Sequence, residues 1–280
     1  MNKSNIAILL ATYNGEKYLR EQIESLYNQT FKDWTIYVHD DGSFDRTLEI
    51  LGEYEKIKNN FIVLKYPSQK GASNNFFSLL QAVEARYYFF ADQDDKWLPN
   101  KVEISLREMQ KREKEGRPTL ICSDAYVTDE NLNIVSSSLW KQAGTHPEYL
   151  DTFDKAGASP FVTGCTMLIN KAAKESVLWK YKEKATMHDA YITLCVLKAK
   201  GEVHPIFTPL LYYRQHNGNT LGAYSSQQSN LWYKISHIKT IIKTDYALLK
   251  MLQALKYGTL LKFLLYKYKY KKQIKQAKKS

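Results

Sequence analysis

Short apolar runs alternate with segments of helical periodicity through the first hundred residues. Four runs have the length of buried strands: 6–11, 34–38, 61–66 and 87–91. Three segments between them repeat apolar residues every three or four positions: 16–28, a segment carrying Leu48, Leu51 and Tyr54, and 75–85. This alternation is typical of βαβ units, so it predicts an α/β fold with a mostly parallel central sheet flanked by helices.

After Gly116 the alternation of apolar runs and helical segments is less regular. Further strands are predicted near 119–127, 161–169 and 203–213, with a helix after Asp189, and we interpret this part as the acceptor half of the same domain. From about residue 225 the chain has a helical pattern rich in Leu, Ile, Tyr and Lys. The prediction is therefore one domain over 1–224 and a C-terminal helical extension over 225–280.

Composition fits a folded protein, because 44% of the 280 residues are hydrophobic and 13% are aromatic. The net charge of +11 first indicates a nucleic-acid binder, but residues 231–280 contain thirteen Lys and a single acid, Asp245. The remaining 27 basic and 28 acidic residues of 1–230 nearly cancel. The excess is therefore a charged arm on a neutral body, and nucleic acid is not an expected partner.

The sequence lacks signals for export or for a membrane span. No stretch reaches the eighteen or so apolar residues that a transmembrane helix needs. The run at 6–11 is too short for a signal peptide. Cys122, Cys165 and Cys195 are widely spaced, which argues against disulfides and structural zinc. A reduced, cytoplasmic protein is the expectation.

Acidic residues follow two of the predicted strands. Asp92-Gln93-Asp94-Asp95 comes directly after the run at 87–91, and carboxylates spaced in this way can converge on Mg²⁺ or Mn²⁺ shared with substrate phosphates. The alternative is a solvated turn. Asp40-Asp41-Gly42-Ser43 ends the second strand, and Thr12-Tyr13-Asn14-Gly15 ends the first. In open α/β sheets the carboxyl ends of the strands bind the ligand, so these three segments predict one site.

Taken in this order, Ala11-Thr12-Tyr13-Asn14-Gly15, Asp40-Asp41-Gly42-Ser43 and Ala91-Asp92-Gln93-Asp94-Asp95 resemble the motifs of glycosyltransferase family 2, over roughly residues 5–220. The resemblance implies a GT-A (Rossmann-like) fold, a nucleotide-diphosphate sugar donor and inversion at the anomeric carbon. It implies that the donor nucleotide is held by Thr12, Asn14, Glu16, Asp41, Lys70, Asn75 and Asp92, and Tyr13 is a further candidate because its ring offers an aromatic face to the base. It also places Asp92 and Asp94 at the end of the site that holds the metal and the diphosphate.

An inverting transfer needs a base that removes the proton of the attacking acceptor hydroxyl. Met187-His188-Asp189 resembles the family's acidic catalytic motif, so Asp189 is the candidate base, with a helix N-cap as the alternative, and His188 is interpreted as its neighbour. Together with Tyr213-Arg214-Gln215-His216 the motif is similar to rhamnosyltransferases that use dTDP-L-rhamnose. The resemblance implies that His216 completes the metal shell and that Arg214 meets a phosphate. Ala190-Tyr191 departs from the usual aromatic pair, so another hexose from a UDP-sugar stays open.

Three residues are candidates for the acceptor side. Phe161-Val162-Thr163-Gly164-Cys165-Thr166 resembles the family's acceptor strand, in which Gly164 would admit a sugar close to the backbone. Cys165 is not expected to be a nucleophile, because direct inversion forms no covalent intermediate. Trp97 and Asp124 are candidate acceptor contacts, with core packing and capping as the equal alternatives.

Lysines recur among the apolar residues of the C-terminal extension. A basic amphipathic helix of this kind can lie on an anionic membrane, which predicts peripheral association with the inner face of the cell membrane and a glycan or lipid-linked saccharide acceptor. The alternatives are packing on the catalytic domain or a contact in a homodimer. The predicted activity is hexosyl transfer in cell-surface polysaccharide biosynthesis.

Two other function classes remain as alternatives. A sugar-phosphate nucleotidyltransferase would use a similar sheet, but it should carry a Gly-rich, basic loop after the first strand, and Thr12-Tyr13-Asn14-Gly15 is not such a loop. A non-catalytic membrane adaptor would explain the basic extension alone.

Overall fold

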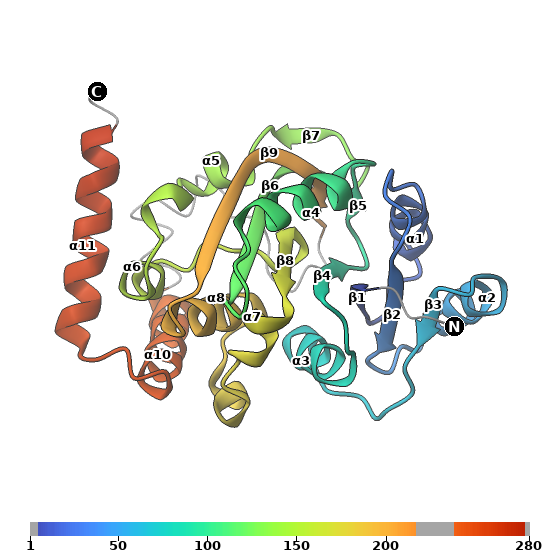
Figure 1. Cartoon of the computed structure of the whole chain (residues 1–280), viewed down its shortest axis with the longest axis horizontal. Helices are drawn as coiled ribbons and strands as arrows, with labels where there is room; N and C mark the ends of the chain where they lie inside the picture. The colour runs from blue at the N-terminus through green and yellow to red at the C-terminus, as the bar shows by residue number, and fades with distance from the viewer. Residues whose placement is uncertain (1–4, 217–237, 278–280) are drawn as a thin grey trace.

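The computed structural model describes residues 5–216 and 238–277 (Figure 1). Its centre is one nine-stranded sheet in the order β3-β2-β1-β4-β8-β6-β9-β5, with β7 paired to β6. The strands are β1 (Ile6–Thr12), β2 (Thr35–Asp40), β3 (Phe61–Val63), β4 (Tyr87–Asp92), β5 (Lys96–Trp97), β6 (Thr119–Thr128), β7 (Ile134–Ser136), β8 (Met167–Asn170) and β9 (Glu202–Arg214).

Helices cover both faces of the sheet. They are α1 (Leu19–Tyr27), α2 (Thr47–Ile57), α3 (Ala72–Ala82), α4 (Lys101–Arg112), α5 (Leu139–Ala143), α6 (Phe153–Ala158), α7 (Lys171–Glu175), α8 (His188–Lys198), α10 (Ile238–Ala254) and α11 (Leu260–Ala277). One hydrophobic cluster joins α1, α2 and α4 to one face, and a second joins α3, α7 and α8 to the other. The predicted α/β architecture is confirmed.

The parallel part of the sheet brings three of the predicted segments to one edge. β3, β2, β1 and β4 run parallel, with Thr12 opposite Asp40 and Ala11 opposite Asp92. Beyond β4 the sheet is mixed, because β8 runs antiparallel to both β4 and β6, while β9 runs parallel to β6. The carboxyl ends of β1, β2 and β4 therefore form one side of a shared site.

The predicted strand at 161–169 is shorter in the structure. β8 begins only at Met167, after a 3₁₀ turn over Gly164–Thr166. Thr166 closes that turn, since its N–H and its hydroxyl both donate to the carbonyl oxygen of Thr163, at 2.9 and 2.7 Å. The apolar pattern alone does not reveal this local competition for a backbone acceptor.

The C-terminal helices pack on the domain and contribute to its core. Met251, Leu255 and Phe263 are buried in the same cluster as α8. Tyr257, between the two helices, lies against Gly157 of α6, where an added Cβ would stand 2.3 Å from its ring. The predicted boundary at 224/225 falls outside the described residues. No helix that the structure describes has the length and apolar character to cross a bilayer.

Candidate active site

Backbone and side-chain hydrogen bonds tie the loop after β1 to the loop after β2. The hydroxyl of Thr12 donates to a carboxylate oxygen of Asp40 at 2.8 Å, and the N–H of Asn14 donates to Ser43 Oγ at 2.7 Å. Glu16 accepts the N–H of Arg46 at 2.9 Å. Thr12, Asn14 and Glu16, which were predicted to hold the nucleoside, therefore lie together. Their hydrogen bonds fix the positions of the two loops at this edge of the sheet.

Asp41 is engaged by the segment that precedes α3. Its carboxylate accepts the hydroxyl of Ser68 and the N–H groups of Gln69, Lys70 and Gly71, at 2.5 to 3.0 Å. Burial raises the pKa of this carboxyl, but these four hydrogen bonds together bring it below its ordinary value. Asp41 and the backbone of Lys70 thus shape the loop, and a contact of either side chain with the donor stays a prediction.

Asn75 is buried and holds His39 instead of facing a ligand. Its side-chain oxygen lies 2.8 Å from His39 Nδ1, and its amide donates to the carbonyl oxygen of His39 at 3.0 Å. Asn75 thus has partners within the protein at both ends of its amide, and a contact of Asn75 with the donor stays a prediction.

Gln93 links the loop after β4 to the loop after β1. The N–H of Tyr13 donates to Gln93 Oε1 at 2.8 Å, and Gln93 Nε2 donates to the carbonyl oxygen of Tyr13 at 2.9 Å. Gly15 permits this contact, since an added Cβ would lie 2.2 Å from Gln93 Oε1. The ring of Tyr13 is 52% exposed and meets the 83% exposed Phe44 edge to face, which leaves an aromatic pair available at the mouth.

A cavity of about 310 Å³ opens between these loops and the end of β9. Its lining residues are Asn14, Gly15, Lys17, Tyr18, Gln93, Asp94, Glu130 and His216. Within it His216 Nε2 lies 2.8 Å from a carboxylate oxygen of Asp94. A carboxylate and an imidazole facing one polar cavity fit a divalent cation such as Mn²⁺, so these two predicted metal residues do come together.

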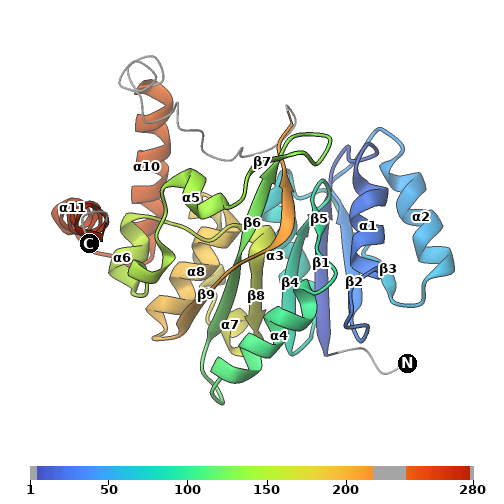
Figure 2. The same cartoon turned by 90° about the horizontal axis from the view of Figure 1, so that it is seen from above.

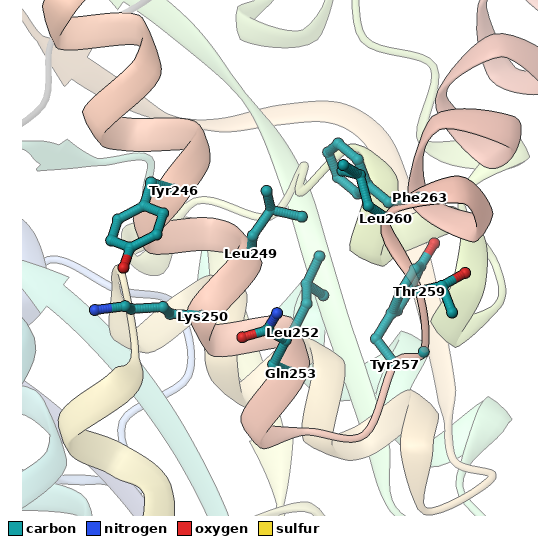
Figure 3. A pocket seen from close by; sticks show the side chains of 10 residues that line it. Tyr246, Leu249, Lys250, Leu252, Gln253, Tyr257, Thr259, Leu260 and Phe263 are labelled. Carbon is teal, nitrogen blue, oxygen red and sulfur yellow. The ribbon is translucent and has the colours of Figure 1, made fainter.

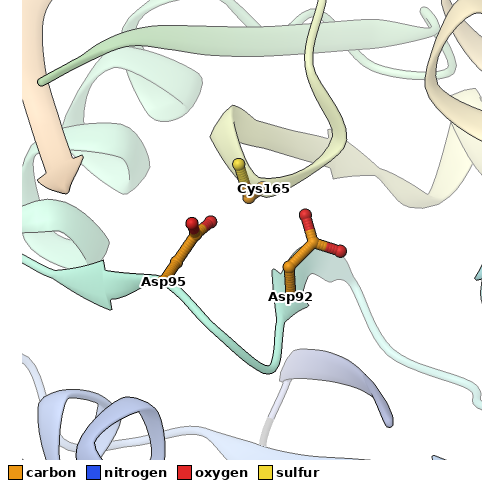
Figure 4. A group of neighbouring side chains, drawn as sticks. All are labelled: Asp92, Asp95 and Cys165. Atoms are coloured by element: carbon orange, nitrogen blue, oxygen red, sulfur yellow. The ribbon is translucent and has the colours of Figure 1, made fainter. Parts of the chain in front are cut away.

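Asp92 takes a different direction from Asp94. Ligand atoms of Asp92, Asp95 and Cys165 all lie within 4.8 Å of one another (Figure 4). A buried thiol is a poor ligand for Mg²⁺ or Mn²⁺, and burial raises the pKa of Cys165 far above its ordinary value. Asp94 meets His216 and Asp92 lies beside Asp95 and Cys165, so a metal shell shared by Asp92 and Asp94 stays a prediction.

Asp92 nevertheless connects the metal end of the site to the candidate base. Burial raises its pKa to about 7, and the charges of Asp94 and Asp189 add to the increase. Contacts agree with this proximity, because Asp189 accepts the N–H of Gly164, and the Sγ of the next residue, Cys165, lies within 4.8 Å of a carboxylate oxygen of Asp92. The structure thus gathers the acidic residues that the sequence placed about a hundred positions apart.

Asp189 is oriented by backbone N–H groups. One carboxylate oxygen accepts the N–H of Gly164 at 3.0 Å, and the other accepts the N–H of Ala190 at 2.6 Å. Burial raises the pKa of Asp189 to about 6, and the two hydrogen bonds limit the increase. A carboxylate with this pKa is mostly ionised at neutral pH and still basic enough to accept a proton.

His188 lies beside Asp189 and is buried among aromatic rings. It stacks on Phe76 at a centroid distance of 4.3 Å, and burial lowers its pKa to about 3, so the imidazole is neutral. A Cβ on Gly164 would stand 2.6 Å from His188 Nε2. Glycine is therefore required here by the His188 ring, whereas the sequence attributed it to the approach of an acceptor.

Arg214 is a structural clamp in this structure. Its buried guanidinium donates to the carbonyl oxygens of Asp94 and Glu130 at 2.7 and 2.6 Å, pairs with the carboxylate of Glu21 and lies 4.5 Å from the ring centroid of Tyr18. The expectation that it meets a phosphate is corrected by these contacts, because its donors are directed into the protein.

The remaining acceptor candidates are also structural. Trp97 is buried against Phe89, and a carboxylate oxygen of Asp124 accepts the N–H groups of Leu139 and Trp140 at 3.0 and 3.3 Å at the start of α5. Core packing and capping, the alternatives left open by the sequence, are what the structure shows for both residues.

Sequence reasoning did not single out several residues of the cavity wall. Lys17, Tyr18, Gln93 and Glu130 line it, and Lys17 pairs with Glu130 at 2.8 Å. Lys17 and Tyr18 come just after the first motif and Glu16, so their position in the sequence was the available signal. Nothing in the sequence pattern links Glu130, which belongs to a turn after β6, to this site.

Comparisons with known proteins agree with the geometry. The family described as "Glycosyl transferase family 2" matches residues 7–178. The dTDP-rhamnosyl transferase RfbG of Shigella flexneri is 27% identical over 249 residues, which cover 80% of this chain and 81% of that protein.

Two solved structures share the fold. TarS 1-349 of S. aureus in complex with UDP-GlcNAc is similar with a TM-score of 0.56 and 18% identity, over 88% of this chain and 71% of the other. The mannosyltransferase PcManGT of Pyrobaculum calidifontis, in complex with GDP-Man and Mn²⁺, is similar with a TM-score of 0.53 and 12% identity, over 95% and 79% of the two chains.

Proposed function

Because this chain belongs to glycosyl transferase family 2, we propose that it transfers a hexose from a nucleotide diphosphate to an acceptor hydroxyl, with inversion at the anomeric carbon. Family membership also removes the nucleotidyltransferase and the adaptor from consideration. The observation that carries the proposal is that Asp94 faces the cavity beside His216, while Asp92 lies next to Cys165, whose neighbour Gly164 holds the carboxylate of Asp189.

The acidic groups divide between two tasks. Asp94 and His216, 2.8 Å apart in the cavity wall, would hold Mg²⁺ or Mn²⁺, which when bound neutralises charge on the departing diphosphate. Tyr13 offers an exposed aromatic face to the base of the nucleotide. A donor held in this way would need its anomeric carbon to face Asp189 for the transfer to occur.

Asp189 acts as the general base. Its carboxylate removes the proton of the acceptor hydroxyl while the acceptor oxygen forms a bond to the anomeric carbon and the bond to the diphosphate oxygen breaks. The N–H of Gly164, 3.0 Å from a carboxylate oxygen, keeps the group in place. The buried thiol of Cys165 has no part in this displacement, because no covalent sugar intermediate is formed.

We infer L-rhamnose from dTDP-L-rhamnose as the first donor to test. The support is the similarity to a dTDP-rhamnosyl transferase together with His188-Asp189. UDP-linked hexoses are the second choice, because TarS was solved with UDP-GlcNAc and the pair Ala190-Tyr191 departs from the rhamnosyltransferase pattern. The product would enter a cell-surface polysaccharide through a glycan or lipid-linked acceptor, with the enzyme on the inner face of the membrane.

A donor panel combined with two variants tests this proposal. Wild-type protein should release nucleoside diphosphate from one dTDP- or UDP-sugar in a Mn²⁺-dependent manner, whereas Asp189→Asn should bind that donor normally and release almost none. Asp94→Ala should lose the Mn²⁺ dependence of nucleotide binding. Equal nucleotide affinity with and without chelator in the wild type would contradict the metal assignment, and normal turnover by Asp189→Asn would contradict the base.

A further inference from the structure

Helix α11 has one face that packs on the domain. Phe263 and Tyr270 are buried in the main hydrophobic cluster, and the hydroxyl of Tyr270 accepts the N–H of His146 at 2.8 Å. Tyr266 and Ile274, on the same side of the helix, pack against that cluster. This face accounts for the docking of α11 beside α6, which both views show (Figures 1 and 2).

The opposite face of α11 exposes a second apolar stripe. Leu261, Leu264, Leu265 and Tyr268 are 77%, 52%, 46% and 66% exposed, and they follow the spacing i, i+3, i+4, i+7. Residues with this spacing lie in one row along a helix. Single exposed apolar residues are ordinary, but a row of four large ones on one helix face indicates a surface that is covered by a partner.

Further apolar surface is exposed at the start of α11, between the stripe and the face that packs on the domain. Leu260 is 55% exposed, and beside it a hollow of about 160 Å³ opens between α10 and α11 (Figure 3). Leu249, Leu252 and Phe263 are among the residues that line this hollow. The exposed apolar surface therefore reaches from the stripe to the junction between α10 and α11.

Positive charge surrounds the stripe. Helical geometry places Lys272 and Lys275 on the same face, one to two turns further along, and Lys269 and Lys271 on its two flanks. No Asp or Glu occurs after Asp245 in the sequence. Such a helix, with an apolar row bordered by lysines only, is suited to the interface between the headgroups and the acyl chains of an anionic bilayer.

We propose that this face, Leu261, Leu264, Leu265 and Tyr268 with Lys269, Lys271, Lys272 and Lys275, docks on an anionic lipid bilayer with the axis of α11 parallel to the membrane. The inference deepens the membrane placement of the proposed function and rests on it. A second copy of the chain is a poorer occupant, because two such faces would bring their lysines together with no acidic partners on either α11.

Docking through α11 also sets the orientation of the enzyme. α11 lies at the end of the molecule opposite α1 and α2 in both views (Figures 1 and 2). The strands β1 to β3 would therefore stay on the side of the aqueous phase, where a nucleotide sugar arrives. The acceptor half of the domain would lie closer to the lipid surface, as a lipid-linked acceptor requires.

Vesicle flotation tests the face directly. The full chain should float with vesicles of phosphatidylcholine containing phosphatidylglycerol, float poorly with phosphatidylcholine alone and be released by salt. Leu261→Gln/Leu265→Gln should lower the partition coefficient by about tenfold or more. The matched control is Ile57→Gln/Val135→Gln, since these residues are 70% and 67% exposed on α2 and β7 and should leave binding unchanged.

The other outcomes are equally decisive. Equal flotation of the stripe variant and the control, or equal binding to neutral vesicles, would overturn the proposal. So would a wild-type dimer that the stripe variant abolishes in the absence of vesicle binding, because a second copy would then cover the face. Flotation needs neither donor nor acceptor, and release of nucleoside diphosphate in solution is assayed separately, so failure of docking is distinguishable from failure of the transferase proposal.

Discussion

The pKa of Asp189 predicts how turnover depends on pH. Burial raises this pKa to about 6, against the opposing effect of the N–H groups of Ala190 and Gly164. A general base must be ionised, so turnover rises as pH increases through this value. About nine-tenths of the carboxyl groups are ionised at pH 7 and about one tenth at pH 5, which predicts a roughly tenfold fall in turnover between these pH values.

The assay is release of nucleoside diphosphate between pH 5 and 8 at saturating donor and Mn²⁺, with donor binding measured at each pH. Saturation matters because the pKa of Asp92, about 7, is also raised, and loss of donor binding would otherwise imitate the loss of a base. Asp189→Asn should lower turnover by about 10²–10⁴-fold, and its pH–rate profile should lack the rise near pH 6. A wild-type profile that stays flat from pH 5 to 7 would refute the reasoning.

Three glycines give further predictions. Gly15→Ala should displace Gln93, whose Oε1 lies 2.2 Å from the new Cβ, and raise KM for the donor with little change in melting temperature. Gly52→Ala, in an open position within α2, should stabilise the fold by about 0.5–1 kcal/mol in urea unfolding and leave KM unchanged. Gly157→Val should force Tyr257 out of its contact with α6, cost about 1–3 kcal/mol and speed limited proteolysis of the C-terminal helices. Unaltered proteolysis would count against that last docking contact.

The sequence was informative wherever hydrophobic periodicity sets the structure. The runs at 6–11 and 87–91 became neighbouring parallel strands, because strands buried on both faces read as continuous apolar segments. The placement of Thr12, Asp40 and Asp92 at one edge then followed from the direction of parallel strands. This part of the site could be predicted from pattern and topology alone.

Periodicity could not tell which polar groups the protein satisfies internally. Asp41 and Asn75 have side chains that could bind a ligand. In the structure Asp41 accepts hydrogen bonds from the loop before α3, and Asn75 bonds to His39. Lys101 is a second example. It lies in a helix rich in charged residues, yet its side chain is buried, with the ammonium group 4.7 Å from the ring centroid of Trp97. Such partners are set by three-dimensional proximity between segments far apart in the sequence.

The Arg214 clamp has a consequence for attempts to change what the enzyme accepts. One guanidinium joins the loop after β4, the turn after β6 and α1, so these wall segments form a single mechanical unit. Grafting one of them from another transferase would strand a buried donor, at about 1–3 kcal/mol for each lost bond. Exchanging these wall segments together should therefore preserve the contacts of Arg214, and a chimaera that exchanges only one of them should unfold at a lower urea concentration than the parent.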